Sequence, residues 1–134
     1  MSLESLNWLA VLAGALLNML VGFLWYSPML FGNLWLRLIG KRAEDIQAKT
    51  TDFVFSFLAA LITAIVLAIL VRGMGASTAL EGLLLGAVIW IGIGATGTLV
   101  YSIFEGPPKS VWLLHGAYQL LVFALQGLLF AVWI

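Results

Sequence analysis

The side chains of this chain that could do chemistry are few, and they gather around two breaks in an otherwise apolar sequence. They are Tyr26, Ser27, Tyr101, Ser102, Glu105, His115, Tyr118 and Gln119. An imidazole titrates near neutral pH, and phenols, hydroxyls and a carboxylate can donate or accept hydrogen bonds. If the neighbouring segments are membrane-spanning helices, which rise about 1.5 Å per residue, all eight lie within about two turns of one membrane surface. We therefore expect a small polar pocket there, able to hold a ligand or an ion.

A structural interpretation competes with this one. Tyrosine at a membrane surface is ordinarily part of the aromatic belt, because its ring is amphipathic. Glu105 lies four residues before Lys109 and could form an ordinary solvated pair with it. The cluster is then an interface feature with no ligand.

Catalysis finds little support in the sequence. His115 has no serine partner in a nucleophile elbow, so a triad is not indicated. The spacing Gly92-x-Gly94-x-x-Gly97 matches a dinucleotide fingerprint, but it lies inside an apolar span and follows no strand. The chain has no cysteine, which excludes disulfides and thiolate metal sites. We predict no enzyme, no cofactor and no metal.

Composition indicates a single transmembrane domain, residues 1–134. The chain has 63% hydrophobic and 9% charged residues, whereas soluble domains have roughly half apolar and a quarter charged residues. Its formal net charge is zero, so no basic field would attract nucleic acid. Membrane lipids are the expected surroundings.

Four segments are long enough to cross a bilayer, which takes about 20 apolar residues. We predict spans over residues 6–26, 53–71, 82–104 and 110–133. Pro28 ends the first span and the pair Pro107-Pro108 ends the third, because proline lacks the amide donor that a helix needs. Apolar residues recur at helical spacing over residues 29–40, which predicts a short amphipathic helix lying in the membrane interface. Residues 41–52 form a polar cytoplasmic loop.

Basic residues set the orientation. Five of them fall on one side, in the connections over residues 37–52 and 105–109, namely Arg37, Lys41, Arg42, Lys49 and Lys109. Arg72 is on the other side. Because short cytoplasmic loops are enriched in Lys and Arg, we predict that both termini are extracytoplasmic.

Small residues recur four apart in three spans. The first span carries Ala10, Gly14, Asn18 and Gly22, the second Ser56, Ala60, Ala64 and Ala68, and the third Gly82, Gly86 and Gly94. Such spacing lets helix backbones approach closely in lipid. These seams predict packing within one bundle, and they leave room for a contact between subunits.

The run W-Y-S-P-x-x-F-G, residues 25–32, is preceded by Asn7-Trp8 and followed by Trp90-x-Gly92, Phe104-Glu105 and Gly116-x-Tyr118. With these motifs the chain resembles the small bacterial four-helix membrane proteins of the DUF1761 family, a domain of unknown function. The resemblance covers nearly the whole chain. It implies a four-span protein of the bacterial inner membrane, and it implies no activity. Where this chain has His115, the family more often has asparagine.

Three functions remain open. The first is a structural or interaction protein, forming a homo-oligomer or an accessory subunit of a membrane complex, and the small-residue seams favour it. The second is a small-molecule or ion transporter or channel, with the polar cluster as its cytoplasmic mouth. The third, an enzyme acting on lipid, would rest on His115 and Glu105 alone.

Overall fold

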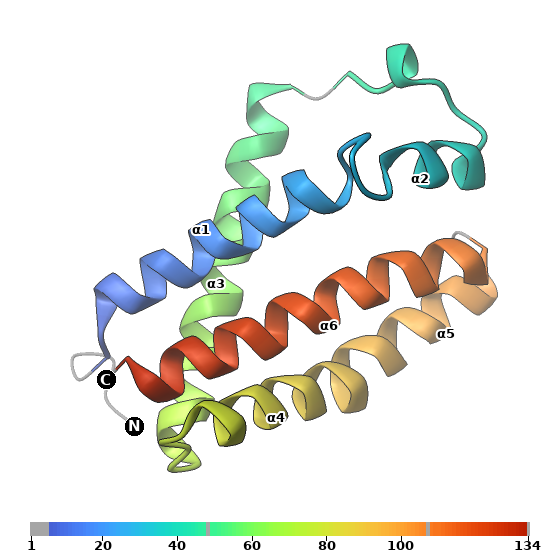
Figure 1. The fold of residues 1–134 in the computed structure, drawn as a ribbon. Coiled ribbons are helices and arrows are strands. Elements are labelled where there is room, and N and C mark those ends of the chain that lie inside the picture. Colours follow the sequence, from blue (N-terminus) through green and yellow to red (C-terminus); the bar gives the residue numbers. More distant parts are fainter. Residues whose placement is uncertain (1–5, 48, 107, 134) are drawn as a thin grey trace.

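The computed structural model describes residues 6–47, 49–106 and 108–133, and within these ranges every regular element is helical. The elements, in order, are α1 (Trp8–Trp25), α2 (Gly32–Ile39), η2 (Ala43–Asp45), α3 (Thr50–Gly73), α4 (Ala79–Ile89), η3 (Trp90–Ala95), α5 (Thr96–Phe104) and α6 (Lys109–Val132). The 3₁₀ turn η2 is the only regular element between α2 and α3 in the described part of that loop. The helices α4 and α5 are joined through the π-helix η3 into one continuous rod, and α6 returns beside it (Figure 1).

Four helical segments are long and apolar enough to cross a membrane, as the sequence predicts. They are Trp8–Trp25, Thr50–Gly73, Ala79–Phe104 and Lys109–Val132. Their outer surfaces carry large apolar side chains, such as Leu9, Phe55 and Ile93, each about 70% exposed. Exposed apolar surface on this scale is unfavourable in water and favourable in the hydrocarbon interior of a membrane. The chain therefore has the architecture of a multi-pass membrane protein.

Caps place two helix starts earlier than hydrophobicity predicts. The helix α3 begins at Thr50, not near residue 53, because the Asp52 carboxylate accepts a hydrogen bond of 2.9 Å from the Lys49 amide. The helix α4 begins at Ala79, not near residue 82, because the Thr78 hydroxyl oxygen accepts from the Glu81 amide at 3.2 Å. The loop predicted over residues 41–52 is correspondingly shorter.

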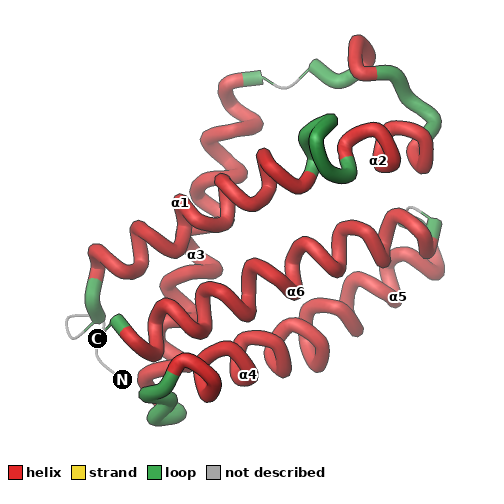
Figure 2. Tube along the Cα trace, viewed as in Figure 1, coloured by secondary structure: helices red, strands yellow, loops and turns green. Residues whose placement is uncertain are grey.

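The spans alternate in direction. The start of α1, the end of α6 and the turn between α3 and α4 lie at one end of the molecule (Figure 1). The short helix α2, the loop that follows it and the turn between α5 and α6 lie at the other end, and that loop is the longest connection (Figure 2). The candidate chemistry therefore gathers at one end of the bundle.

Small residues bring α4 against α6, the most extensive helix contact. A Cβ atom on Gly82 would overlap the carbonyl oxygen of Gly127, and one on Gly86 would overlap that of Phe123. The two backbones therefore touch, which only glycine permits at these positions.

The predicted seam on the first span also faces α6. A Cβ atom on Gly14 would lie 2.6 Å from Cζ of Phe130, and one on Gly22 would lie 3.0 Å from the Tyr118 hydroxyl oxygen. Asn18, between them, is buried. The alanine seam of α3 is also buried inside the bundle from Ala60 onward, whereas Ser56 is exposed.

The side chain nearest to Gly94 belongs to its own helical rod and not to another helix. A Cβ atom there would overlap the ring of Trp90, which lies one turn earlier on the same rod. The Trp90 ring is buried and lies 5.3 Å from the ring of Phe123 on α6. The wide π-helical turn accommodates this indole, and the hydroxyls of Thr96 and Thr98 donate to carbonyl groups of the turn at 2.9 and 3.0 Å.

Candidate functional site

The turn after α1 folds back on itself within six residues. The amides of Leu30 and Gly32 both donate to the Ser27 carbonyl, at 3.1 and 2.9 Å, and the Phe31 amide donates to the Trp25 carbonyl at 2.9 Å. A Cβ atom on Gly32 would lie 2.5 Å from the Tyr26 carbonyl oxygen, too close for any other residue. The W-Y-S-P-x-x-F-G run therefore encodes a closed turn that needs its glycine.

This turn fixes where α2 lies. The rings of Trp25 and Phe31 pack at 4.5 Å, and Trp35 meets Tyr26 edge-on at 5.1 Å. The Ser27 hydroxyl donates to the Leu24 carbonyl at 2.7 Å and so helps to end α1. The predicted amphipathic helix over residues 29–40 is accordingly shorter, Gly32–Ile39, because the turn occupies the first three of those positions.

Two polar side chains of α6 meet α1 near this turn. The Tyr26 hydroxyl and Nδ1 of His115 lie 3.0 Å apart, a hydrogen bond in which the phenol donates if the imidazole proton is on Nε2. One turn deeper, the Tyr118 hydroxyl lies 2.6 Å from Oδ1 of Asn18, to which it donates. The Tyr26 and Tyr118 rings are in edge contact at 5.8 Å, which links the two bonds.

The polar contacts continue toward the middle of the bundle. The fully buried Gln126 donates from Nε2 to the Gly14 carbonyl at 2.8 Å. Its Oε1 has no hydrogen-bond partner among the described residues. With Val122 also fully buried, the α1–α6 seam beyond Tyr118 is filled by side chains.

Beside the Tyr26–His115 pair lies a cavity of about 270 Å³, here called the aromatic cavity. Its lining residues come from the end of α1, from α2, from α5 and from α6. They are Tyr26, Trp35, Thr98, Tyr101, Ser102, Val111, Trp112 and His115. Two phenol rings, two indoles and one imidazole thus line a space smaller than the about 300–1,000 Å³ of drug-sized sites.

Hydrogen bonds hold two walls of the aromatic cavity. The indole nitrogen of Trp112 donates to the Thr98 hydroxyl at 3.0 Å, which fixes the ring between α5 and α6. Thr98 in turn donates to the Gly94 carbonyl, so the π-helical turn supports this wall. Most of the surface that lines the cavity is apolar.

Half of the predicted polar cluster lines the aromatic cavity, namely Tyr26, Tyr101, Ser102 and His115. The other four residues lie elsewhere. Ser27 is in the turn, Tyr118 is buried behind Tyr26, Glu105 is exposed where α5 ends, and Gln119 is half-buried on α6.

Three polar or aromatic residues that line the aromatic cavity were not predicted as site residues from the sequence, namely Trp35, Thr98 and Trp112. Indoles are common in the headgroup belt of membrane proteins, so the residue type of Trp35 alone does not mark it as a site residue. One signal was available, because Trp112 precedes His115 by three residues and Thr98 precedes Ser102 by four, which places each pair on one helix face.

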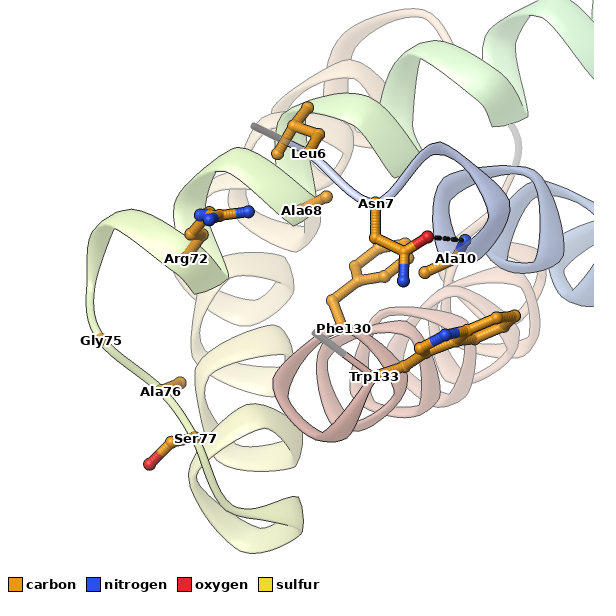
Figure 3. Close-up of a pocket in the computed structure, with 10 residues that line it drawn as sticks. All are labelled: Leu6, Asn7, Ala10, Ala68, Arg72, Gly75, Ala76, Ser77, Phe130 and Trp133. Atoms are coloured by element: carbon orange, nitrogen blue, oxygen red, sulfur yellow. Dashed lines mark hydrogen bonds between the residues drawn. The ribbon is translucent and has the colours of Figure 1, made fainter. Parts of the chain in front are cut away.

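A second cavity, of about 200 Å³, lies at the opposite end of the bundle. Its lining side chains come from the start of α1, the end of α3 and its following turn, and the end of α6 (Figure 3). The Asn7 amide oxygen there accepts from the Ala10 amide and so serves as the helix cap. None of the predicted cluster lines this cavity. In the part of the chain that the structure describes, no three His, Asp or Glu side chains come together to hold a metal ion.

Comparison with known proteins gives one match. A family described as "Protein of unknown function (DUF1761)" matches residues 9–131, nearly the whole chain. No curated protein and no solved structure matches significantly.

Proposed function

The chain belongs to the DUF1761 family, whose description names no activity, and from its own geometry we propose that it binds a small molecule in the aromatic cavity. The observation that carries this proposal is the convergence of four separate chain segments on one space lined by Tyr26, Trp35, Tyr101, Trp112 and His115. The closed turn at Gly32 and the bond between Trp112 and Thr98 position these rings in advance. Pre-positioned walls lower the ordering cost of binding.

The same geometry weakens the case for a purely structural role. That interpretation rests on the small-residue seams, and Gly14, Gly22, Gly82 and Gly86 all face α6 of the same chain. Because these small residues already pack inside the bundle, less small-residue surface is left for contact with a partner.

Assembly is the second candidate function. At Gly92, Gly97 and Gly116 a Cβ atom would meet nothing within 4 Å, so these positions leave open surface on the α4–α5 rod and on α6. Open glycine positions suit close approach of another helix. A homo-oligomer or a larger complex would be the product.

Binding is favoured over an open channel. The seam behind Tyr118 is filled by Val122 and Gln126, both fully buried. A transporter that uses the aromatic cavity would need α1 and α6 to separate along this seam.

For the membrane setting we propose a bacterial inner membrane protein with both termini extracytoplasmic and α2 lying in the cytoplasmic interface. Its support is the distribution of basic residues, five at the α2 end and Arg72 at the other. The aromatic cavity is then at the cytoplasmic side.

A single cysteine in this cysteine-free chain tests the binding proposal. The thiol of Ser102→Cys, in the cavity wall, should react with a small methanethiosulfonate reagent more slowly when a small-molecule extract of the native cells is added. The exposed Ser110→Cys is the matched control and should react at an unchanged rate. Equal rates with and without extract at both positions would contradict ligand binding in this cavity.

A further inference from the structure

If the aromatic cavity is a binding site, as proposed above, the side chains that line it indicate which class of ligand it binds. Two indoles and two phenols line one small space, contributed by Trp35, Trp112, Tyr26 and Tyr101. The face of an aromatic ring carries negative electrostatic potential and attracts cations, most strongly in indole. Aromatic cages are sites where several such rings line one space, as these four do, with Tyr26 and Trp35 in edge-to-face contact at 5.1 Å.

Formal charge at the walls does not oppose a cation. The eight lining residues include no Lys, Arg, Asp or Glu. An anionic ligand would therefore meet no Lys or Arg among these eight residues; their one basic group is the His115 imidazole, whose Nδ1 is paired with the Tyr26 hydroxyl. A cation would meet aromatic rings. Acidic residues Glu44, Asp45, Asp52 and Glu105 lie at the same end of the chain as the five basic ones, so this end carries little net charge.

Hydrogen bonding separates two kinds of cation. A primary ammonium needs about three acceptors that point at it to replace its water. The Tyr26 and Thr98 hydroxyls are already oriented by their bonds to His115 and Trp112, so their remaining lone pairs are not free to turn toward an ammonium. A fully methylated ammonium needs no acceptor, and its charge is spread over methyl groups that pack on rings. The size of the cavity, about 270 Å³, also suits a ligand of few heavy atoms.

We propose that the aromatic cavity binds a quaternary ammonium group through its four aromatic rings. The group belongs either to a free small cation or to the headgroup of a choline lipid in the adjoining leaflet. Both sources present the same trimethylammonium to the cage.

Choline is the probe, titrated into protein purified in a maltoside detergent, which has no ammonium of its own, with binding followed by ligand-observed NMR. Its neutral isostere 3,3-dimethylbutan-1-ol has the same shape without the charge, and ethanolamine carries a primary ammonium. We expect saturable choline binding that is at least about tenfold tighter than binding of either comparison compound.

Loss of one ring should weaken choline binding about 3- to 30-fold, the range of a single cation–π contact. Tyr101→Leu is the first variant because the Tyr101 side chain is 57% exposed and its truncation leaves the core intact. Tyr101→Phe keeps the ring and should keep the affinity. Trp35→Leu repeats the test on α2, and Trp8→Leu, at the far end of α1, is its control.

Equal affinity for choline and its neutral isostere, or choline binding that Tyr101→Leu and Trp35→Leu leave unchanged, would overturn the ammonium proposal. The cavity would still be a ligand site if the Ser102→Cys protection persists, so the two proposals fail separately. Lipid nanodiscs then identify the source. If choline lipids compete with free choline and phosphatidylglycerol does not, the headgroup enters the cage. If free choline binds equally in both, the ligand is a free cation.

Discussion

The contact between α4 and α6 yields the sharpest stability prediction, for the substitution Gly82→Ala. The added Cβ atom would overlap the Gly127 carbonyl oxygen and lie 2.5 Å from Cβ of Ala131, both on α6. Backbone and a short side chain cannot yield as a long side chain can, so the helices must separate. Overpacking of this kind costs about 1–3 kcal/mol, and the better helix propensity of alanine returns up to about 1 kcal/mol. We expect a net loss of about 1–2 kcal/mol in the free energy of unfolding.

Gly97→Ala is the matched control on the same rod. A Cβ atom on Gly97 meets nothing within 4 Å, so only the propensity term acts and stability should be unchanged or up to about 1 kcal/mol higher. The assay is equilibrium unfolding in mixed micelles of maltoside and increasing dodecyl sulfate, followed by helical circular dichroism. Both variants gain the propensity term, so their free energies of unfolding should differ by the overpacking cost alone, about 1–3 kcal/mol.

One result would refute the reasoning about this contact. If Gly82→Ala unfolds at the same detergent fraction as Gly97→Ala, the backbones of α4 and α6 do not touch at this position. The seams would then be free for a partner, and assembly would regain support.

Other predictions follow from the turn, the buried polar pair and the orientation. Gly32→Ala should open the closed turn, because its Cβ atom would lie 2.5 Å from a carbonyl oxygen; we expect a loss of about 1–3 kcal/mol and weaker choline binding, measured by unfolding and by titration. Tyr118→Phe removes the hydrogen bond to Asn18 and should cost about 0.6–1.7 kcal/mol; in a double-mutant cycle with Asn18→Leu, additive effects would show that the pair is not coupled. In intact cells an impermeant maleimide should label Ser77→Cys, whereas Gln47→Cys should need permeabilisation, and the reverse pattern would invert the proposed topology.

Much of the fold is predictable because the membrane imposes simple constraints. The lengths of the apolar runs and the prolines give four spanning helices, close to the observed bounds. The starts of α3 and α4 are earlier than predicted because caps at Asp52 and Thr78 act through single hydrogen bonds, which average hydrophobicity does not register.

The π-helix is not predictable from local sequence. It forms where Trp90 turns into the bundle against Phe123, a residue distant in the chain. The same tertiary contact explains why Gly94, which has the spacing of an interhelical seam, instead accommodates a ring of its own helix.

The candidate site was half predictable. Polarity at one level of the membrane points to Tyr26, Tyr101 and His115, which the structure brings to one cavity. The indoles that complete the cavity are chemically the same as ordinary belt residues, and only the fold of the turn at Gly32 brings Trp35 back over Tyr26.

Native mass spectrometry of the protein, extracted in a maltoside detergent from its own membrane, shows whether the aromatic cavity holds a ligand. We expect a retained small molecule that is lost from Tyr101→Leu and kept by Trp8→Leu. A defined oligomer or complex that carries no small molecule, or a ligand that Tyr101→Leu retains in full, would contradict binding in the aromatic cavity.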